Sequence, residues 1–98
     1  MRTLMRVEMD TETANPRVAD GSLQKSMIEA FAQLKPEATY FALENGCRNA
    51  YIVFDMKDAS QIPSLVEPMF QGAQARISLV PVMNLEDLQN GMREASKH

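Results

Sequence analysis

The sequence predicts an α+β fold in which helices cover one antiparallel sheet, and three observations lead to this prediction. Residues 1–9 and 74–82 alternate between apolar and polar side chains, which is the period of a β-strand. Residues 38–44 and 47–55 are two apolar runs on either side of an Asn-Gly pair, which is typical of a β-hairpin. The stretches between these strands carry apolar residues at helical spacing.

The first strand, residues 1–9, is followed by a polar segment and then by a helix. We expect residues 11–15 to be a connection, because Asn15 and Pro16 resemble an N-cap and the first position of a helix. Gly21 should interrupt this segment, with Ser22 capping a new turn. The helix that follows has apolar residues spaced by four, four and three positions, and it should end before Pro36: Leu23, Met27, Phe31 and Leu34.

The central hairpin has a predictable register because Asn-Gly is typical of a two-residue type I′ turn. With Asn45 and Gly46 in the turn, Tyr40 faces Tyr51 and Ala42 faces Asn49 across the strands. The other side of the hairpin is more apolar, so we expect it to lie beneath the helices: Phe41, Leu43, Ile52 and Phe54.

The second half of the chain repeats the helix and strand pattern. Asp58 is a candidate cap for a helix with a regular apolar stripe, and Pro68 should kink or shorten the last turn of that helix. The strand over residues 74–82 follows. Asn84 then starts a closing helix with four apolar residues on one side: Leu85, Leu88, Met92 and Ala95.

The element order is therefore β-α-β-β-α-β plus a C-terminal helix. This is the split βαβ, or ferredoxin-like, arrangement. Right-handed crossovers give a four-stranded antiparallel sheet in the order 4-1-3-2 with both main helices on one face. With 98 residues, the chain is predicted to be a single domain over residues 1–98.

The face of the sheet without helices is predicted to be about half apolar. This is too apolar for a face left wholly to water, yet Arg6, Asn49 and Arg76 would need polar partners if they were buried. Two copies of this face laid together would satisfy both requirements, and a C2 contact is the most common way to achieve this. We therefore expect a homodimer.

The segments LKPEATYF, YIVFDMKDASQIP and VPVMNLEDL, together with this element order, resemble a family of small uncharacterised bacterial proteins in the dimeric α/β-barrel superfamily. The resemblance implies that two sheets pair into a dimeric α/β barrel. Relatives in the superfamily include isomerases, cofactor-free monooxygenases, polyketide cyclases and ligand-sensing modules. The resemblance therefore brings no particular activity, since fold alone does not determine function.

Composition excludes several classes of function. A net charge of −3 provides no basic field for nucleic acid, and no apolar stretch is long enough to be a membrane span or a leader. Cys47 is the only cysteine and His98 the only histidine, so we expect no metal site, no cofactor and no His-based catalytic triad. The expected location is the cytoplasm.

The candidate ligand-binding cavity lies on the helix-free face and comprises Arg6, Tyr40, Asn49, Tyr51 and Arg76. The two arginines lie on neighbouring strands, so they could hold a carboxylate or an enolate, or each could pair with a protein carboxylate. The tyrosines are either a packed cross-strand pair or walls of a site with hydroxyl groups. Asn49 is either solvated near an open edge or an oriented hydrogen-bond donor.

Two functions are compatible with these residues. The first is a homodimeric small-ligand-binding or regulatory module with no reaction. The alternative is a cofactor-independent enzyme acting on a small aromatic or polyketide-like acid. In that enzyme Arg6 and Arg76 would hold the negative charge of the substrate, while Tyr40, Tyr51 or Asn49 would stabilise an oxyanion.

Overall fold

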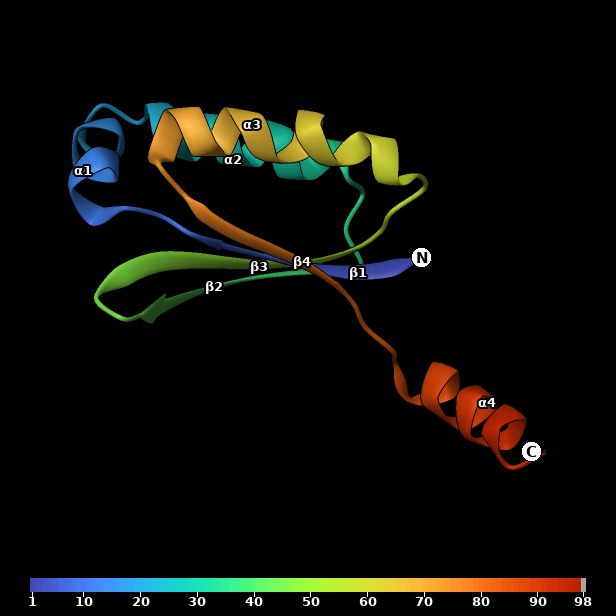
Figure 1. Ribbon diagram of the computed structural model, residues 1–98. Helices are drawn as coiled ribbons and strands as arrows, with labels where there is room; N and C mark the ends of the chain where they lie inside the picture. Colours follow the sequence, from blue (N-terminus) through green and yellow to red (C-terminus); the bar gives the residue numbers. More distant parts are fainter. Residues whose placement is uncertain (98) are drawn as a thin grey trace.

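The computed structural model describes residues 1–97 and has two layers, a sheet and a set of helices on one of its faces (Figure 1). The strands are β1 (Arg2–Glu8), β2 (Ala38–Glu44), β3 (Cys47–Asp55) and β4 (Arg76–Pro81). The helices are α1 (Thr11–Ala19), α2 (Ser22–Gln33), α3 (Ile62–Ala73) and α4 (Leu85–Ala95), with a short 3₁₀ turn at Ala59–Gln61. His98 lies outside the described residues.

All neighbouring strands of the sheet are antiparallel, and their order is β2-β3-β1-β4. Read from the opposite edge, this order is 4-1-3-2. Helices α1, α2 and α3 cover one face, and no helix within residues 1–97 covers the other face (Figure 1). The arrangement is an α+β fold compatible with a ferredoxin-like domain.

The hairpin register is confirmed. Tyr40 pairs with Tyr51 and Ala42 pairs with Asn49. Asn45 and Gly46 both have positive φ, 56° and 70°, as a type I′ turn requires. The side chains of β2 and β3 are therefore assigned to the two faces as the sequence predicts.

The expectation of a polar connection over residues 11–15 is wrong, because these residues are the first turns of α1. The helix begins earlier because Asp10 is its N-cap and its carboxylate accepts a hydrogen bond from the backbone N–H of Thr13. Hydrogen bonds from the hydroxyl and the backbone of Thr13 lower the pKa of Asp10. Pro16 is consequently inside the helix and does not begin it. Gly21, with φ of 80°, separates α1 from α2 as expected.

Pro68 does not end α3, which contradicts the expected shortening. The helix continues to Ala73 and ends where Gln74 adopts a left-handed conformation with φ of 44°. A proline removes one backbone hydrogen bond of a helix, whereas the apolar stripe of α3 packs along the sheet over several turns. That packing offsets the missing bond.

The core lies between the sheet and the three helices. Its most buried members on the sheet are Met5, Val7, Ala50 and Ile52, and Leu23 and Phe31 of α2 belong to the same apolar cluster. Phe41 and Leu43 face this layer as predicted, but they are not beneath the helices. They are 62% and 83% exposed, because β2 is the edge strand and α2 borders it without covering it, with the Phe31 ring centre 6.4 Å from that of Phe41. This part of the prediction is corrected.

Helix α4 projects away from the body on the helix-free side of the sheet (Figure 1). Its start is fixed by a capping box between Asn84 and Asp87 and by an ion pair between Asp87 and Arg2. Arg2 also donates to Glu37, and this hydrogen bond is the main reason that the pKa of Arg2 is raised.

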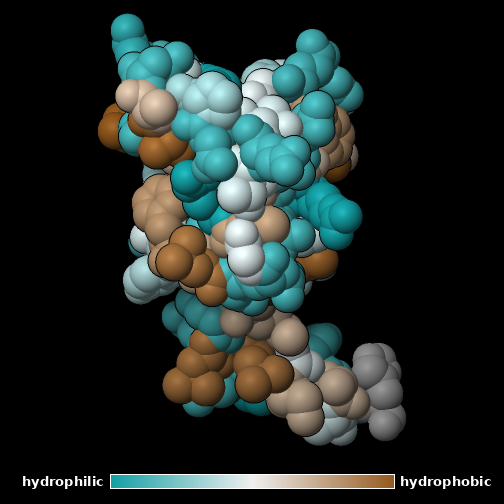
Figure 2. All heavy atoms as spheres, turned by 90° about the vertical axis from the view of Figure 1, so that its left-hand side faces the viewer, coloured by the Kyte–Doolittle hydropathy of each residue, from teal (hydrophilic) through white to brown (hydrophobic). Residues whose placement is uncertain are grey.

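The apolar stripe of α4 is exposed. Leu85, Leu88 and Met92 are 70%, 44% and 62% exposed. Figure 2 shows hydrophobic surface on the lower protrusion of the molecule. In a single chain this stripe has no apolar surface to cover it.

Candidate functional site

The central part of the helix-free face carries three rows of side chains that run across the strands. One row, Ala38, Val53, Leu4 and Val80, is apolar. The next row contains Tyr40, Tyr51, Arg6 and Ser78, and the third contains Ala42, Asn49, Glu8 and Arg76. The register therefore places all five predicted site residues in two adjacent rows.

Arg6 is the centre of a polar network on this face. Its Nε and Nη2 atoms donate to Asn49 Oδ1, both at 3.3 Å. Its Nη2 lies 3.5 Å from Glu8 Oε1 and 3.6 Å from Glu44 Oε2, and its guanidinium carbon lies 5.7 Å from the centre of the Tyr51 ring. The Tyr51 hydroxyl donates to Glu44. Arg6, Asn49 and Tyr51 thus form one connected unit.

Asn49 is not solvated at an open edge, so that reading is wrong. Its side chain is 1% exposed, because β3 is a central strand and Arg6 lies over it. Its Nδ2 donates to the backbone oxygens of Glu44, at 3.2 Å, and Cys47, at 3.0 Å. The amide is an oriented donor, but it donates to the chain itself.

Arg76 and Tyr40 lie at the margin of the network. Arg76 Nη1 is 4.0 Å from Glu8 Oε2, and its side chain is otherwise in solvent. Glu8 is the common partner of both arginines and also accepts from Asn45 Nδ2 at 3.2 Å. Tyr40 is 68% exposed and lies opposite Tyr51 on the neighbouring strand. The structure thus brings the two arginines to one carboxylate and leaves Tyr40 outside.

The network is balanced in charge. Two guanidinium groups are matched by the carboxylates of Glu8 and Glu44. A hollow of about 240 Å³ lies beside it and is lined by six residues: Arg6, Glu8, Asn45, Arg76, Ile77 and Ser78. Such a surface can donate and accept hydrogen bonds from a small polar molecule. It offers less attraction to an anion than two free arginines would.

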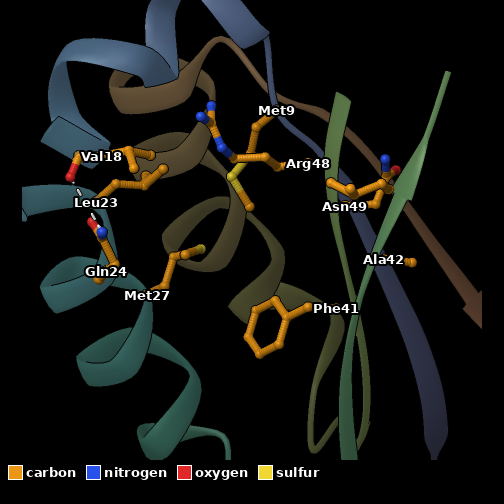
Figure 3. Close-up of a pocket in the computed structure, with 10 residues that line it drawn as sticks. Met9, Val18, Leu23, Gln24, Met27, Phe41, Ala42, Arg48 and Asn49 are labelled. Atoms are coloured by element: carbon orange, nitrogen blue, oxygen red, sulfur yellow. Dashed lines mark hydrogen bonds between the residues drawn. The ribbon is translucent and has the colours of Figure 1, made fainter. Parts of the chain in front are cut away.

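A second pocket, which the sequence did not predict, lies on the other side of the sheet between α2 and the hairpin (Figure 3). It has a volume of about 340 Å³ and mostly apolar walls. Arg48 lines it from β3, with its guanidinium group turned towards α1 (Figure 3). The available signal was Arg48 opposite Leu43, a charged residue on the apolar side of the hairpin.

Neither a metal site nor a membrane span is found in the described part of the chain. Residues 1–97 contain no cluster of three or more His, Cys, Asp or Glu side chains that could hold a metal ion. None of the helices in this range has the length and apolar character needed to cross a bilayer. Comparison of the chain with family models, curated proteins and solved structures gives no match.

Proposed function

We propose that the chain is a homodimeric binding module in which the helix-free face of one copy covers that of a second copy. The observation that carries this proposal is the composition of that face, an apolar margin around a charge-balanced polar centre. The apolar row from Ala38 to Val80 and the exposed ring of Tyr40 form the margin, and the Arg6 network forms the centre.

The exposed surface area of the single chain is large enough for an interface with a second copy. The chain exposes 6709 Å². A compact protein of 11.0 kDa is expected to expose about 5,600 Å², so this chain exposes roughly 1,100 Å² more. A standard interface removes about 800 Å² from each partner. The excess is therefore sufficient for one stable contact with a second copy.

The position of α4 supports the same partner. The helix extends past the sheet on the helix-free side, where a copy seated on that face would lie (Figure 1). Its stripe of Leu85, Leu88 and Met92 is exposed in the single chain. In a C2 dimer, both helices would pack this stripe on the opposite copy, so each apolar contact would occur twice.

The charge balance of the centre supports a binding role over the enzymatic alternative. Burying an unpaired charge is expensive, whereas Arg6 and Arg76 already have Glu8 and Glu44 as partners. The faces can therefore close without an external anion. Two facing hollows would enclose water or a small polar organic molecule. An enzyme that holds a carboxylate substrate would need guanidinium groups free of these partners.

The test compares two substitutions of exposed β-branched residues by lysine. Val80→Lys places a charge on the helix-free face, and Ile28→Lys places the same charge on the outer surface of α2, far from the proposed interface. Light scattering after size exclusion should give the mass of two chains for the wild type and for Ile28→Lys. It should give one chain, or a dissociation constant raised about ten-fold or more, for Val80→Lys, because a desolvated apolar contact is lost twice.

Native mass spectrometry of the wild type reports the bound molecule in the same experiment. A dimer that carries extra mass, lost when the dimer dissociates, would support a ligand between the faces. A wild-type chain that stays monomeric at high concentration would overturn the proposal. The proposal would also be overturned if the wild type, Ile28→Lys and a folded Val80→Lys all had the same mass in solution.

A further inference from the structure

The pocket between α2 and the hairpin is a second, independent site, because it lies within one chain and on the opposite side of the sheet from the proposed dimer contact. Its walls come from three parts of the chain: Met9 after β1, Val18 to Met27 across α1 and α2, and the hairpin strands (Figure 3). With about 340 Å³, it is at the lower end of the size range of small-molecule pockets.

The walls of this pocket are largely hydrocarbon. Leu23 and Met27 line it from α2, and Phe41 and Leu43 line it from the edge strand. Phe41 and Leu43 face the helix layer and are nevertheless exposed, so the pocket has an apolar mouth that the chain itself does not close. Such a surface favours an apolar molecule of limited size.

Arg48 supplies the one cationic group of the pocket. Its Nη2 donates to Asn15 Oδ1 at 3.0 Å, which holds the guanidinium group in place. Its Nη1 is buried and has no hydrogen-bond partner within residues 1–97. No carboxylate in the same range forms an ion pair with Arg48, in contrast to Arg6 and Arg76 on the other face.

A buried guanidinium nitrogen without an acceptor is costly. A rotation of the Arg48 side chain that turns Nη1 from α1 towards the pocket would let a ligand oxygen accept its hydrogen bond and would remove that cost. Carboxylates form the most favourable hydrogen bonds with arginine because both partners are charged. The remaining walls contact hydrocarbon. The chemistry that fits the pocket is therefore a carboxylate at one end and a short apolar body at the other.

We propose that this pocket binds a small amphipathic monocarboxylate, with its carboxylate on Arg48 and its apolar body between Met27 and Phe41. The site needs no second copy of the chain, and Asn49 is the one residue of the Arg6 network among its lining residues. A medium-chain fatty acid is the simplest molecule with this chemistry.

The probe pair is octanoate and octan-1-ol, which share the apolar chain and differ in charge. Binding is followed by NMR of protein labelled at the methionine methyl groups, because Met9 and Met27 line the pocket. Octanoate should shift both methyl signals in a saturable way and bind the wild type more tightly than octan-1-ol. The methyl signal of Met83, which follows β4, serves as an internal reference.

Three variants separate the contribution of the Arg48 charge to binding from that of the apolar contact with Phe41. Arg48→Gln should weaken octanoate binding about ten-fold or more, since a charge-assisted hydrogen bond is lost, and should leave octan-1-ol binding unchanged. Phe41→Ser, at an exposed position with low risk to folding, should weaken both probes. Lys25→Gln removes the same charge from α2 outside the pocket lining and should change neither.

The proposal is overturned if octanoate leaves the Met9 and Met27 signals unchanged at millimolar concentration. It is also overturned if octanoate binds Arg48→Gln or Phe41→Ser as tightly as the wild type. These outcomes are independent of chain mass, so failure of this proposal and failure of the dimer are distinguished by different measurements.

Discussion

At the scale of single residues, the most informative side chain is Asn49. It is buried on a face without helices, and each of its polar atoms has a partner in the chain. Its amide holds the ends of the hairpin strands through two backbone oxygens and positions the Arg6 guanidinium group. A buried amide with four hydrogen bonds stabilises one arrangement of its neighbours.

We expect Asn49→Ala to lower the free energy of unfolding by about 2–3 kcal/mol, because it leaves Arg6 and two backbone oxygens without their partner. Urea unfolding at one fixed protein concentration measures this, since dissociation of a dimer would otherwise contribute. Asn90→Ala, on the exposed surface of α4, is the control and should cost less than about 0.5 kcal/mol. Equal stability of the two variants would contradict the assigned role of Asn49.

The strand pairing of Asn49 can be predicted from the sequence, but its burial cannot. The pairing of Asn49 with Ala42 follows from Asn45-Gly46, because the turn type determines which residues face one another. Its burial does not follow, because it depends on where the long side chain of Arg6 lies. Arg48 was overlooked for a related reason. Its unpaired nitrogen results from the positions of Asn15 and the helix layer, which no local pattern encodes.

At the scale of elements, one arginine forms hydrogen bonds that join all three helices of the helix layer. Arg17 on α1 donates from Nε to the Ser22 hydroxyl at 3.2 Å and from Nη2 to Ser26 at 2.9 Å, both on α2. Its Nη1 donates to the Gly72 backbone oxygen of α3 at 3.0 Å. A Cβ at Gly72 would lie 2.8 Å from this nitrogen, so the absence of a side chain there permits the contact.

Arg17→Met should lower the free energy of unfolding by about 1–3 kcal/mol, because it retains the apolar stem and removes bonds to two helices. Amide hydrogen exchange should show the loss in α1 first, since α1 is joined to the layer mainly through α2. Arg93→Met, on α4, removes the same charge elsewhere and should leave exchange in α1 unchanged. Unaltered exchange in α1 of Arg17→Met would show that packing alone holds it.

Elements were predicted best where one local signal dominates. The hairpin and the Asn84 cap were located correctly because turn and cap chemistry act over a few residues. The expected connection over residues 11–15 and the expected shortening of α3 at Pro68 are wrong, because in each case a second effect opposes the local signal. Asp10 capped α1 before the Asn15-Pro16 pair could, and packing of α3 outweighed one proline. The direction of α4 was not predictable, since it depends on ion pairs of Arg2 with Glu37 and Asp87.

At the scale of the whole molecule, the single chain is extended. Its radius of gyration is 15.7 Å and its dimensions are 55 × 27 × 17 Å. A compact chain of 98 residues has a radius of gyration of about 13 Å. The difference comes from α4, which lies beyond the sheet and contains no buried residue (Figure 1). Within the single chain, α4 is stabilised by its capping box and by the ion pair of Asp87 with Arg2, and an apolar surface from a second copy would add to its stability.

We expect Leu88→Glu on α4 to weaken the proposed dimer at least about ten-fold, because each of two symmetric contacts loses a buried leucine and gains a charge. Glutamate forms helices about as readily as leucine, so α4 itself should persist by circular dichroism. Asn90→Glu adds the same charge on the opposite side of the helix and should leave the dissociation constant unchanged. Sedimentation at several concentrations measures all three proteins. If Leu88→Glu and Asn90→Glu dissociate at the concentration of the wild type, α4 is not part of the contact between copies.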